Sequence, residues 1–514
     1  MPKIKVHEKA LAHLSRGLYR SPASALRELV SNAWDANATA VRITTNYPKF
    51  FQIAIEDNGV GFTREELKGI MEGGIGNSQK RPQTTPAIHG RPVIGRLGIG
   101  LLGIAQICLG FRILSRPKNS EGFAARIRLY DLLKERLDRN DPDVTTDSGG
   151  TKEIEVGTYE IEKDFDPESI RFGTTILADD LHPTFVQAFQ ESVNFPEFVP
   201  PPKEWATALK IASRVRSLQE LGDYWRLIWE LSASCPVPYV NERAVPRKLI
   251  EDDQKRLTHY DFKVIIDGLE LRKPVDLHRN PGGYTTFQIQ PQHVKVYDRD
   301  LKFHGYIAVQ EGLQLKPDEL RGILLRIKNV AIGYYDPSLL DYRINQGPRS
   351  RWLTGEIIVD EGLENALNID RDSFNRFHPE FRAVQTYVHK VLSTEIFPEV
   401  YRKIETRSES RDEIKSNTRI KNLRETISEV CDVRTTLRTQ PTSKSENIAV
   451  ATVEESAEAL KLTIPNPESL KTKKTYRQLA ASVLGIYEIA LRGKSSEARR
   501  RTFAELLLKL LARW

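Results

Sequence analysis

The sequence is poor in sulfur and has no long apolar run. Its 514 residues include two methionines and three cysteines, Cys108, Cys235 and Cys431. The cysteines lie far apart, which excludes a disulfide framework or a CxxC metal site and favours a reducing, intracellular setting. The N-terminus has no apolar signal-peptide core, and no later stretch reaches the roughly 18 uncharged apolar residues of a membrane helix. We therefore expect a cytoplasmic protein without a membrane partner.

The overall composition is that of a globular protein. Hydrophobic residues make up 39%, charged residues 28%, and the mean hydropathy is −0.44. The length suggests about three domains. A proline-rich segment at 195–202 reads as a stiff linker, which predicts domains at 1–195, 203–395 and 401–514.

Positive charge is concentrated in the C-terminal tail. The formal net charge is +7, and residues 471–514 hold eleven Lys or Arg against three Glu. Residues 401–445 are charged and helix-compatible, and 475–512 have the pattern of two amphipathic helices. We expect a helical, basic C-terminal region.

The first domain opens with a helix followed by two strands. Ser21 and Pro22 form a helix start signal, and apolar residues then recur at three and four up to Ala36. Residues 41–44 and 51–55 alternate apolar and polar side chains, as paired strands with one buried face do. The fold class is therefore expected to be α+β.

Further elements are expected downstream. Strand patterns occur at 122–129, 173–177, 262–266, 306–309 and 322–330, and a helix pattern occurs at 381–392. These make 203–395 a second α+β region. Trp225 and Trp229, four residues apart, are interpreted as one packed helix face.

The first helix presents a carboxylate and an amide on one face. Glu28 and Asn32 are four residues apart, and Asp35 follows one turn later. A carboxylate there can polarise water while an amide oxygen coordinates a cation. The alternative for each residue alone is a solvated helix surface.

Residues 95–100 (GRLGIG) form a glycine loop after a glycine- and proline-rich segment that begins at 72. Backbone N–H groups approach phosphate oxygens closely where no Cβ intervenes, and residues 101–108 are expected to form a following helix. The loop is neither a Walker A motif, which needs GKS or GKT, nor a Rossmann fingerprint. An ordinary turn is the alternative.

Four segments together resemble a known family. Residues 28–36 (ELVSNAWDA), 57–62 (DNGVGF), 95–100 (GRLGIG) and 173–176 (GTTI) are similar in order and spacing to the motifs of the GHKL ATPases. That family includes gyrase B, the ninety-kilodalton heat-shock chaperones, MutL and MORC proteins and sensor histidine kinases. The resemblance implies a Bergerat-type α/β sandwich that binds ATP and Mg²⁺, followed by a transducer-like domain.

The resemblance also implies residue roles. Glu28 would be the general base for the attacking water, Asn32 would hold Mg²⁺, and Asp57 would accept from the adenine amino group. The implied nucleotide-binding residues are Asn32, Asp35, Asp57, Gly59, Gly61, Ser78, Lys80, Gly95, Arg96, Leu97, Gly98, Ile99, Gly100, Thr174 and Thr175.

Two of the implied contacts have open alternatives. Ser78 and Lys80 lie in a segment similar to the family's lid, but Lys80 could equally be a solvated loop lysine. Residues 351–371 resemble the middle segment of the heat-shock chaperones, which makes Arg371 a candidate catalytic sensor of the γ-phosphate. A surface ion pair of Arg371 with Asp370 or Asp372 is the alternative.

Sensor histidine kinases carry a phosphoacceptor-histidine domain before the first motif, but only about twenty residues precede that motif here. The resemblance therefore favours ATP hydrolysis over protein phosphorylation. In this family ATP typically closes an N-terminal dimer, so an ATP-dependent homodimer is expected. The first 21 residues could be a dimer-swapping arm or a helix packed on its own domain.

The object of the ATP cycle stays open among three classes. The basic tail favours DNA or RNA, since clustered cations release phosphate counterions. The chaperone-like 351–371 segment favours a protein client. A third interpretation is an ATP-sensing module that regulates a partner effector enzyme, for instance one encoded in the same operon. Topoisomerisation is not expected, because no strand-breakage motif is present.

Overall fold

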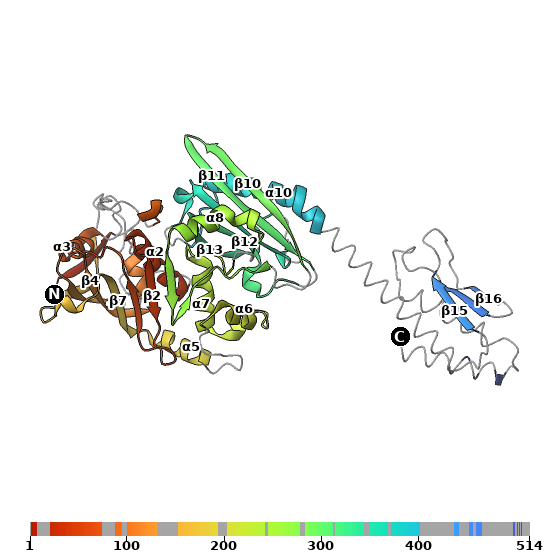
Figure 1. Cartoon of the computed structure of the whole chain (residues 1–514), viewed down its shortest axis with the longest axis horizontal. Helices are drawn as coiled ribbons and strands as arrows, with labels where there is room; N and C mark the ends of the chain where they lie inside the picture. The colour runs from red at the N-terminus through yellow and green to blue at the C-terminus, as the bar shows by residue number, and fades with distance from the viewer. Residues whose placement is uncertain are drawn as a thin grey trace, which may run out of the picture. The chain divides into compact units, whose positions relative to one another are not determined.

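The computed structural model divides into two units, Met1–Pro398 and Glu399–Trp514, and each is described by itself. The first unit is described at residues 2–7, 21–74, 88–94, 100–130, 153–193, 203–241, 245–277, 283–311, 314–343, 350–368 and 372–398. The second is described at 399–400, 436–441, 452–455, 459–464, 497–498, 501, 503 and 505. Figure 1 shows the elements along the chain.

A nine-stranded sheet forms the larger part of the first unit, in the order β1-β6-β5-β4-β7-β3-β2-β8-β9. Its strands are β1 (Lys3–His7), β2 (Ala40–Thr44), β3 (Ile53–Asp57), β4 (Cys108–Arg116), β5 (Phe123–Leu129), β6 (Glu153–Ile161), β7 (Gly173–Leu181), β8 (Lys263–Ile266) and β9 (Leu269–Glu270). The pairs are antiparallel except β2 with β8, which run parallel. Strands from beyond residue 203 thus complete the sheet of the first 195 residues.

A five-stranded sheet follows, in the order β10-β11-β14-β12-β13. Its strands are β10 (Tyr284–Val296), β11 (Arg299–Gln310), β12 (Gly322–Ile327), β13 (Val330–Asp336) and β14 (Leu353–Glu361). β12 and β14 are parallel, and the other pairs are antiparallel. β12 and β14 are buried along almost their whole length, as strands covered on both faces are.

Helices of the first unit are α2 (Pro22–Asp35), α3 (Arg64–Gly69), α5 (Pro183–Val193), α6 (Trp205–Ala212), α7 (Asp223–Ser234), α8 (Arg247–His259) and α10 (Pro379–Val391). Short 3-10 turns occur at η3 (Ile88–Gly90), η4 (Gly100–Gln106), η5 (Pro167–Ser169), η6 (Leu218–Leu221), η8 (Asp318–Leu320) and η9 (Glu364–Ala366), and π-helical turns at η1 (Ile70–Gly74) and η10 (Leu392–Ile396). The helix expected at 101–108 is instead the short η4, which ends before β4 begins.

The expected start of the first helix is confirmed. Ser21 is the N-cap of α2 and its side chain accepts from the Ser24 N–H, while Pro22 occupies the first turn, where a missing N–H costs nothing. α2 packs between η4 and α7. As a result nearly every residue from Ala23 to Trp34 is buried, including charged ones.

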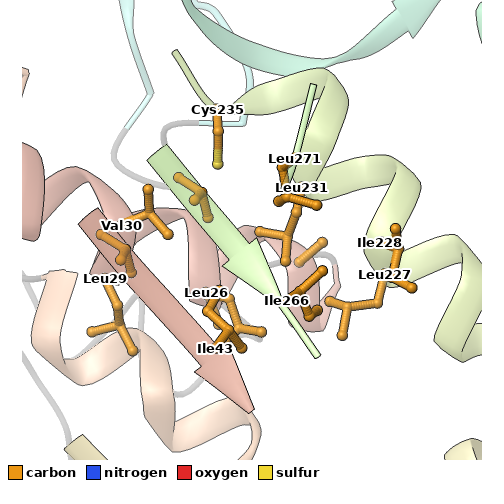
Figure 2. Packing of buried hydrophobic residues seen from close by; sticks show 14 of the residues in the cluster. Leu26, Leu29, Val30, Ile43, Leu227, Ile228, Leu231, Cys235, Ile266 and Leu271 are labelled. Carbon is orange, nitrogen blue, oxygen red and sulfur yellow. The ribbon is translucent and has the colours of Figure 1, made fainter. Parts of the chain in front are cut away.

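The core joins the two expected domains of the first unit. Figure 2 shows Leu26, Leu29 and Val30 of α2 beside Ile43 of β2, with Ile266 of β8 and Leu231 of α7 packed in the same cluster. Trp225 and Trp229 on α7 are buried, so their interpretation as a packed helix face is confirmed. The mixed α+β class is confirmed as well, whereas the three-domain division of the chain stays a proposal.

The C-terminal region, expected to be helical and basic, also contains strands. The described residues of the second unit include a three-stranded sheet, β15-β17-β16, made by β15 (Thr436–Pro441), β16 (Thr452–Glu455) and β17 (Ala459–Ile464). β15 and β17 are parallel and β16 is antiparallel to β17. Of these strands, only β17 has a period-2 pattern, with Leu460, Leu462 and Ile464 separated by Lys461 and Thr463. The helices expected at 475–512 lie mostly outside the described residues.

In the part of the chain that the structure describes, no helix combines the length and apolarity needed to span a membrane. Cys108 and Cys235 are free and buried.

Candidate nucleotide site

The C-terminal turn of α2 is the point where the sequence motifs meet. Val60 of the turn after β3 donates its N–H to the Ala36 carbonyl, at 2.8 Å. Ile94, just before the glycine loop, donates its N–H to Asp35 Oδ1, also at 2.8 Å. The helix, the aspartate turn and the segment that leads into the glycine loop are therefore adjacent.

α2 places its two motif side chains in different surroundings. Glu28 is only 3% exposed, whereas Asn32, one turn later on the same face, is partly exposed. On a helix that is otherwise almost completely buried, Asn32 and Asp35 are the polar groups that reach a surface. A buried carboxylate, Glu28, and a partly exposed amide, Asn32, therefore lie one helical turn apart, an arrangement that suits a water-activating base and a cation ligand.

Glu28 is one end of a buried chain of charges. Arg27 Nη2 lies 3.4 Å from Glu28 Oε1, and Arg27 Nη1 lies 2.7 Å from Asp372 Oδ1, with all three side chains almost inaccessible to solvent. Burial by itself lowers the pKa of Arg27, but the charges of Asp372 and Glu28 outweigh it and raise the pKa. Arg27 therefore stays charged and links Glu28 to the segment after β14.

The aspartate turn is built on three neighbouring strands. β3 pairs Asp57 with Thr174 of β7, and β7 pairs Thr174 with Ser115 of β4. Asp57 Oδ1 accepts the Gly59 N–H at 2.8 Å. Burial raises the pKa of Asp57 to about 6, against the opposing effect of hydrogen bonds from the Gly59 and Thr174 backbone. The Asp57 carboxyl group therefore has a pKa close to neutral pH.

Ser115 completes this row, and sequence reasoning missed it. The Ser115 hydroxyl accepts the Phe62 N–H at 2.9 Å, donates to the Gly173 carbonyl at 3.3 Å and lies 3.5 Å from Thr174 Oγ1. It is completely buried. Its only signal in the sequence is one polar residue in the apolar run of β4, which alternation alone places on the buried face.

Gly173 is required by close backbone packing. Its φ is +109°, and a Cβ there would lie 2.0 Å from the Asp57 carbonyl oxygen. Gly61 has φ +67°, and a Cβ there would lie 3.1 Å from the backbone of Arg116. Both glycines therefore let the turns at the ends of β3 and β7 close on their neighbours. Thr175, next to Thr174, is partly buried and pairs with Glu56 and Leu114.

The segment 88–94 is fastened to the end of α2. Trp34 Nε1 donates to the Pro92 carbonyl at 2.9 Å, and Asn37 Oδ1 accepts the Ile88 N–H at 3.0 Å. Arg91 donates to the Ala38 carbonyl and to the Tyr260 carbonyl, and its guanidinium lies 4.9 Å from the Trp34 ring centroid. Asp35, expected to bind nucleotide, accepts the N–H of Ile94, the residue before the glycine loop.

Several expected residues fall outside the described part of the chain. They are Ser78, Lys80, Gly95, Arg96, Leu97, Gly98, Ile99 and Arg371. Gly100 begins η4, which packs on α2. The predicted roles of these residues, and those of Glu28, Asn32, Asp35, Asp57, Gly59, Gly61, Thr174 and Thr175, stay predictions.

The five-stranded sheet reaches the site through its β12–β13 hairpin. Lys328, at the hairpin turn, lies 3.1 Å from Glu364 and donates to the Val93 carbonyl at 3.4 Å. Tyr334 of β13 has its hydroxyl 2.7 Å from Ser21 Oγ, the N-cap of α2. One hairpin therefore contacts both the approach to the glycine loop and the start of the helix that carries Glu28.

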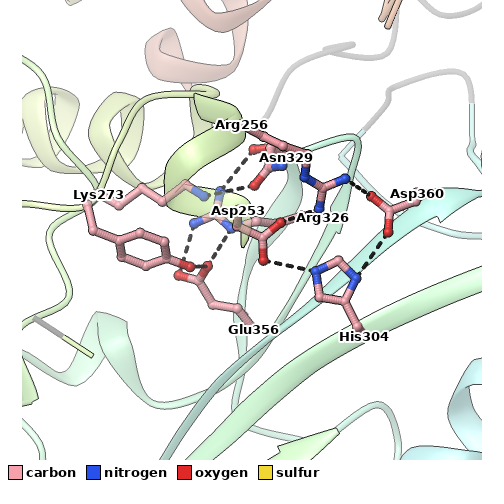
Figure 3. Close-up of polar contacts among 9 residues, drawn as sticks. Asp253, Arg256, Lys273, His304, Arg326, Asn329, Glu356 and Asp360 are labelled. Atoms are coloured by element: carbon pink, nitrogen blue, oxygen red, sulfur yellow. Dashed lines mark hydrogen bonds and ion pairs between the residues drawn. The ribbon is translucent and has the colours of Figure 1, made fainter. Parts of the chain in front are cut away.

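A buried polar cluster lies behind that hairpin (Figure 3). Arg326 and Glu356 form a two-point ion pair, Nε to Oε2 at 2.7 Å and Nη2 to Oε1 at 3.0 Å, and both are fully buried. Burial alone raises the pKa of Glu356, but Arg326 and Lys273 reverse this and lower the pKa to about 2. Burial lowers the pKa of Lys273 to about 7. With its hydroxyl partners Tyr239 and Tyr335, Glu356 is fully paired, which is typical of a structural cluster.

The same cluster contains a closed ring of charges. His304 Nε2 lies 2.9 Å from Asp253 and Nδ1 lies 3.0 Å from Asp360, and Arg256 contacts the same two carboxylates. Although burial lowers the pKa of His304, its bonds to Asp253 and Asp360 raise it to about 9. His304 is therefore an imidazolium near neutral pH and joins α8 to the five-stranded sheet.

Comparison with known proteins identifies the class of the N-terminal region. Residues 19–155 match the family described as histidine kinase-, DNA gyrase B-, and HSP90-like ATPase. This region is therefore a GHKL-type ATPase domain, and the resemblance drawn from its motifs is confirmed. ATP binding is the general property that the domain type implies.

Two individual proteins are similar to parts of the chain. A putative type II restriction enzyme HgiDII of Herpetosiphon aurantiacus is 44% identical over 97 residues, which are 19% of this chain and 15% of that protein. The chain thus matches about a seventh of that relative's length. The crystal structure of the N-terminal domain of a DNA repair protein covers 75% of this chain and 97% of its own, with 13% identity and a TM-score of 0.38.

Proposed function

We propose that the protein is an Mg²⁺-dependent ATPase that acts as a nucleotide-gated, dimeric clamp or switch on DNA. The observation that carries the proposal is the meeting of three motifs on the last turn of α2, through the Val60 to Ala36 and Ile94 to Asp35 hydrogen bonds. A site for ATP must recognise the adenine ring at one end and hold the phosphates at the other. The Asp57 turn and the segment leading into the glycine loop supply these two ends side by side.

The residues divide the chemistry as follows. Asp57 accepts from the adenine amino group, with Thr174 and Ser115 fixing the strand ends around it. Glu28 takes the proton of the attacking water, and Arg27 holds the Glu28 carboxylate in one place. Since phosphoryl transfer depends mainly on positioning and charge neutralisation, an oriented general base and backbone N–H groups for the phosphates are the protein's main contributions.

Asn32 fits the role of magnesium ligand. It is a partly exposed amide on a buried helix, one turn from Glu28, and amide oxygens suit hard cations. Mg²⁺, when bound with the phosphates, neutralises charge that develops on them. Arg371 is proposed as a cationic sensor of the terminal phosphate, carried by the segment that Asp372 ties to Arg27.

DNA is the proposed object of the switch. The excess of positive charge at 471–514 suits a phosphate backbone. The relative that is 44% identical over 97 residues is named as a putative type II restriction enzyme, which also favours DNA.

The test is ATP turnover by the full chain and its Glu28→Ala variant, with and without plasmid DNA at low and moderate salt. We expect Glu28→Ala to bind ATP but lose turnover by roughly 100-fold or more, the usual contribution of a general base. Glu65→Ala, which removes an exposed carboxylate of α3, is the matched control and should leave turnover unchanged. Stimulation by DNA that fades with salt supports the clamp.

Two outcomes would redirect the proposal. Equal turnover in the Glu28→Ala variant would refute the assignment of the base. Glu28-dependent turnover that is indifferent to DNA would refute the DNA clamp and favour a chaperone-like ATPase or a module gated by a partner effector enzyme.

A further inference from the structure

A cavity outside the nucleotide site lies between α6, α7 and the loops that precede β12 and β14. It has a volume of about 720 Å³. Pockets of roughly 300–1,000 Å³ hold small molecules and cofactors. None of the residues assigned to ATP lines it, so it is a separate feature of the molecule.

Its floor holds two buried polar groups without partners. Trp229 and Thr354 line the cavity with side chains that are 3% and 2% exposed, and the buried atoms Trp229 Nε1 and Thr354 Oγ1 make no hydrogen bond to the protein within the described ranges. Buried polar groups are nearly always paired. An indole N–H can only donate and a hydroxyl can do both, so an acceptor atom of a ligand suits either group.

The five-stranded sheet contains another buried polar side chain without a partner among the described residues, Gln310. Ala308 pairs with Thr354 across β11 and β14, and Gln310 lies two residues further along the same face. Both amide atoms of Gln310 are buried and unpaired among the described residues. Gln310 does not line the cavity, so among the described residues Trp229 and Thr354 alone bring buried, unpaired polar atoms to its lining.

The rim is positively charged. Four of the lining residues are cations, Arg216, Lys316, Arg321 and Arg351, and Asp276 is the one lining carboxylate among the described residues. Asp318 pairs with Arg321 at 2.6 Å and with Arg216 at 3.5 Å. Lys316 and Arg351 are exposed and have no carboxylate partner in the described part of the chain.

The cations are close enough to affect one another. Burial lowers the pKa of Arg321, and the charges of Arg216 and Arg351 lower it further, against the opposing effect of Asp318. An anion placed between them would relieve this repulsion and form charge-assisted hydrogen bonds. The walls, in contrast, are apolar, with Leu209, Leu277 and Leu315 among them.

We propose that this cavity binds a small organic anion, a flat apolar body that lies against Trp229 and carries a phosphate or carboxylate group held by Arg351 and Lys316. Thr354 and the Trp229 indole N–H would bind a polar atom of the ligand's buried end. The proposal is independent of the ATPase assignment, since it uses none of the same residues.

The probe for a first test is 1-anilinonaphthalene-8-sulfonate, which combines a flat apolar body with an anionic group and fluoresces when it is shielded from water. The full chain should bind it at one saturable site. Arg351→Gln and Thr354→Val should each weaken binding by about tenfold, the effect of removing one charge-assisted or buried hydrogen bond. Arg343→Gln, an exposed arginine that does not line the cavity, is the matched control.

A second pair of variants separates binding from folding. Thr354→Ser keeps the hydroxyl and should keep the affinity that Thr354→Val loses. If Arg351→Gln and Thr354→Val change the affinity no more than Arg343→Gln does, the two buried polar groups are satisfied by solvent alone and the proposal is wrong.

Two further arms identify the site and the head group. Binding of the dye should persist in Asp57→Asn protein, and its loss there would place the dye in the nucleotide site and overturn the proposal. Displacement of the dye by adenosine 5′-monophosphate supports a phosphate ligand, and displacement by 2-naphthoate supports a carboxylate. Displacement by neither compound would also overturn the proposal.

Discussion

Arg27 and Asp372 lie 345 positions apart in the chain and form a buried ion pair, with Arg27 Nη1 at 2.7 Å from Asp372 Oδ1. The pair connects the helix that carries Glu28 to the segment that follows β14. Arg27 also donates to the Ala331 carbonyl on β13 at 3.3 Å. The position of Glu28 therefore depends on residues of the five-stranded sheet as well as on its own helix.

Asp372→Asn should destabilise the first unit. It removes one partner of a buried ion pair and leaves the Arg27 charge less well compensated, which costs about 3 kcal/mol or more of the free energy of unfolding. Urea unfolding followed by tryptophan fluorescence measures this. Arg126→Gln removes an exposed ion pair to Glu162, at 3.7 Å, and should cost less than about 1 kcal/mol. Equal effects of the two substitutions would show that the buried pair contributes nothing special.

Binding of the adenine base should depend on pH through Asp57. Its carboxyl has a pKa raised to about 6 by burial, and only the charged form accepts a hydrogen bond with both oxygens. Affinity for adenosine, which carries no phosphate to titrate, should rise with pH up to about 6 and then level off. At pH 5 it should be about tenfold below the plateau. A flat profile between pH 5 and 7 would contradict the role of Asp57.

The same shift has the opposite effect on stability. An acid whose pKa is raised in the folded state binds more protons when folded, so the contribution of Asp57 to stability falls as pH rises from about 4 to about 6. Asp57→Asn removes this dependence. The free energies of unfolding of the two proteins should therefore differ more at pH 7 than at pH 4.

Gly173→Ala should disrupt the aspartate turn. The new Cβ would lie 2.0 Å from the Asp57 carbonyl at a φ of +109°, so β3 and β7 would have to separate. We expect a loss of several kcal/mol in stability, about the cost of overpacking added to backbone strain, together with loss of ATP binding. Gly69→Ala is the control, because a Cβ there meets nothing within 4 Å at the end of α3. A Gly173→Ala protein that still binds ATP normally would refute the close packing of the two turns.

His304→Gln should destabilise the protein near neutral pH and much less at high pH. The pKa of His304 is raised to about 9, so its ion pairs stabilise the fold below about 6.5 in full and lose that effect as pH rises through 9. The difference in unfolding free energy between the two proteins should be up to about 3 kcal/mol at pH 6.5 and small at pH 10. Lys273 titrates in the same range, but it does so in both proteins and cancels in the difference. A difference that does not change with pH would mean that His304 acts through packing alone.

The nucleotide motifs could be predicted from the sequence because their signals are local. The Ser21 and Pro22 start of α2 and the alternation in β2 and β3 depend on neighbouring residues, and the structure confirms both. The parallel pairing of β2 with β8 could not be predicted in this way. It pairs Ala40 with Lys263, and neither short strand has a sequence feature that specifies which strand it pairs with.

The buried charges were missed for a related reason. From the sequence alone, an arginine on a helix such as Arg27 is expected to be exposed to solvent, since most arginines are. Its burial follows from α2 being covered by η4 on one side and α7 on another, and α7 lies some 190 residues away in the chain. A sign of this existed in the sequence, because Ala23, Leu26 and Val30 form a second apolar stripe beside that of Ala25, Leu29 and Ala33.

The pairing of β2 with β8 also has a consequence for synthesis of the protein on the ribosome. β2 is made early, but its parallel neighbour appears only about 220 residues later. At about 5–20 residues per second, the edge of β2 stays uncovered for roughly 10 to 45 s. An uncovered strand edge is a place where other chains can add. The nascent chain therefore passes through a period in which its nucleotide-binding half is nearly complete and yet exposed to aggregation, and a cell that makes this protein has reason to shield it during that time.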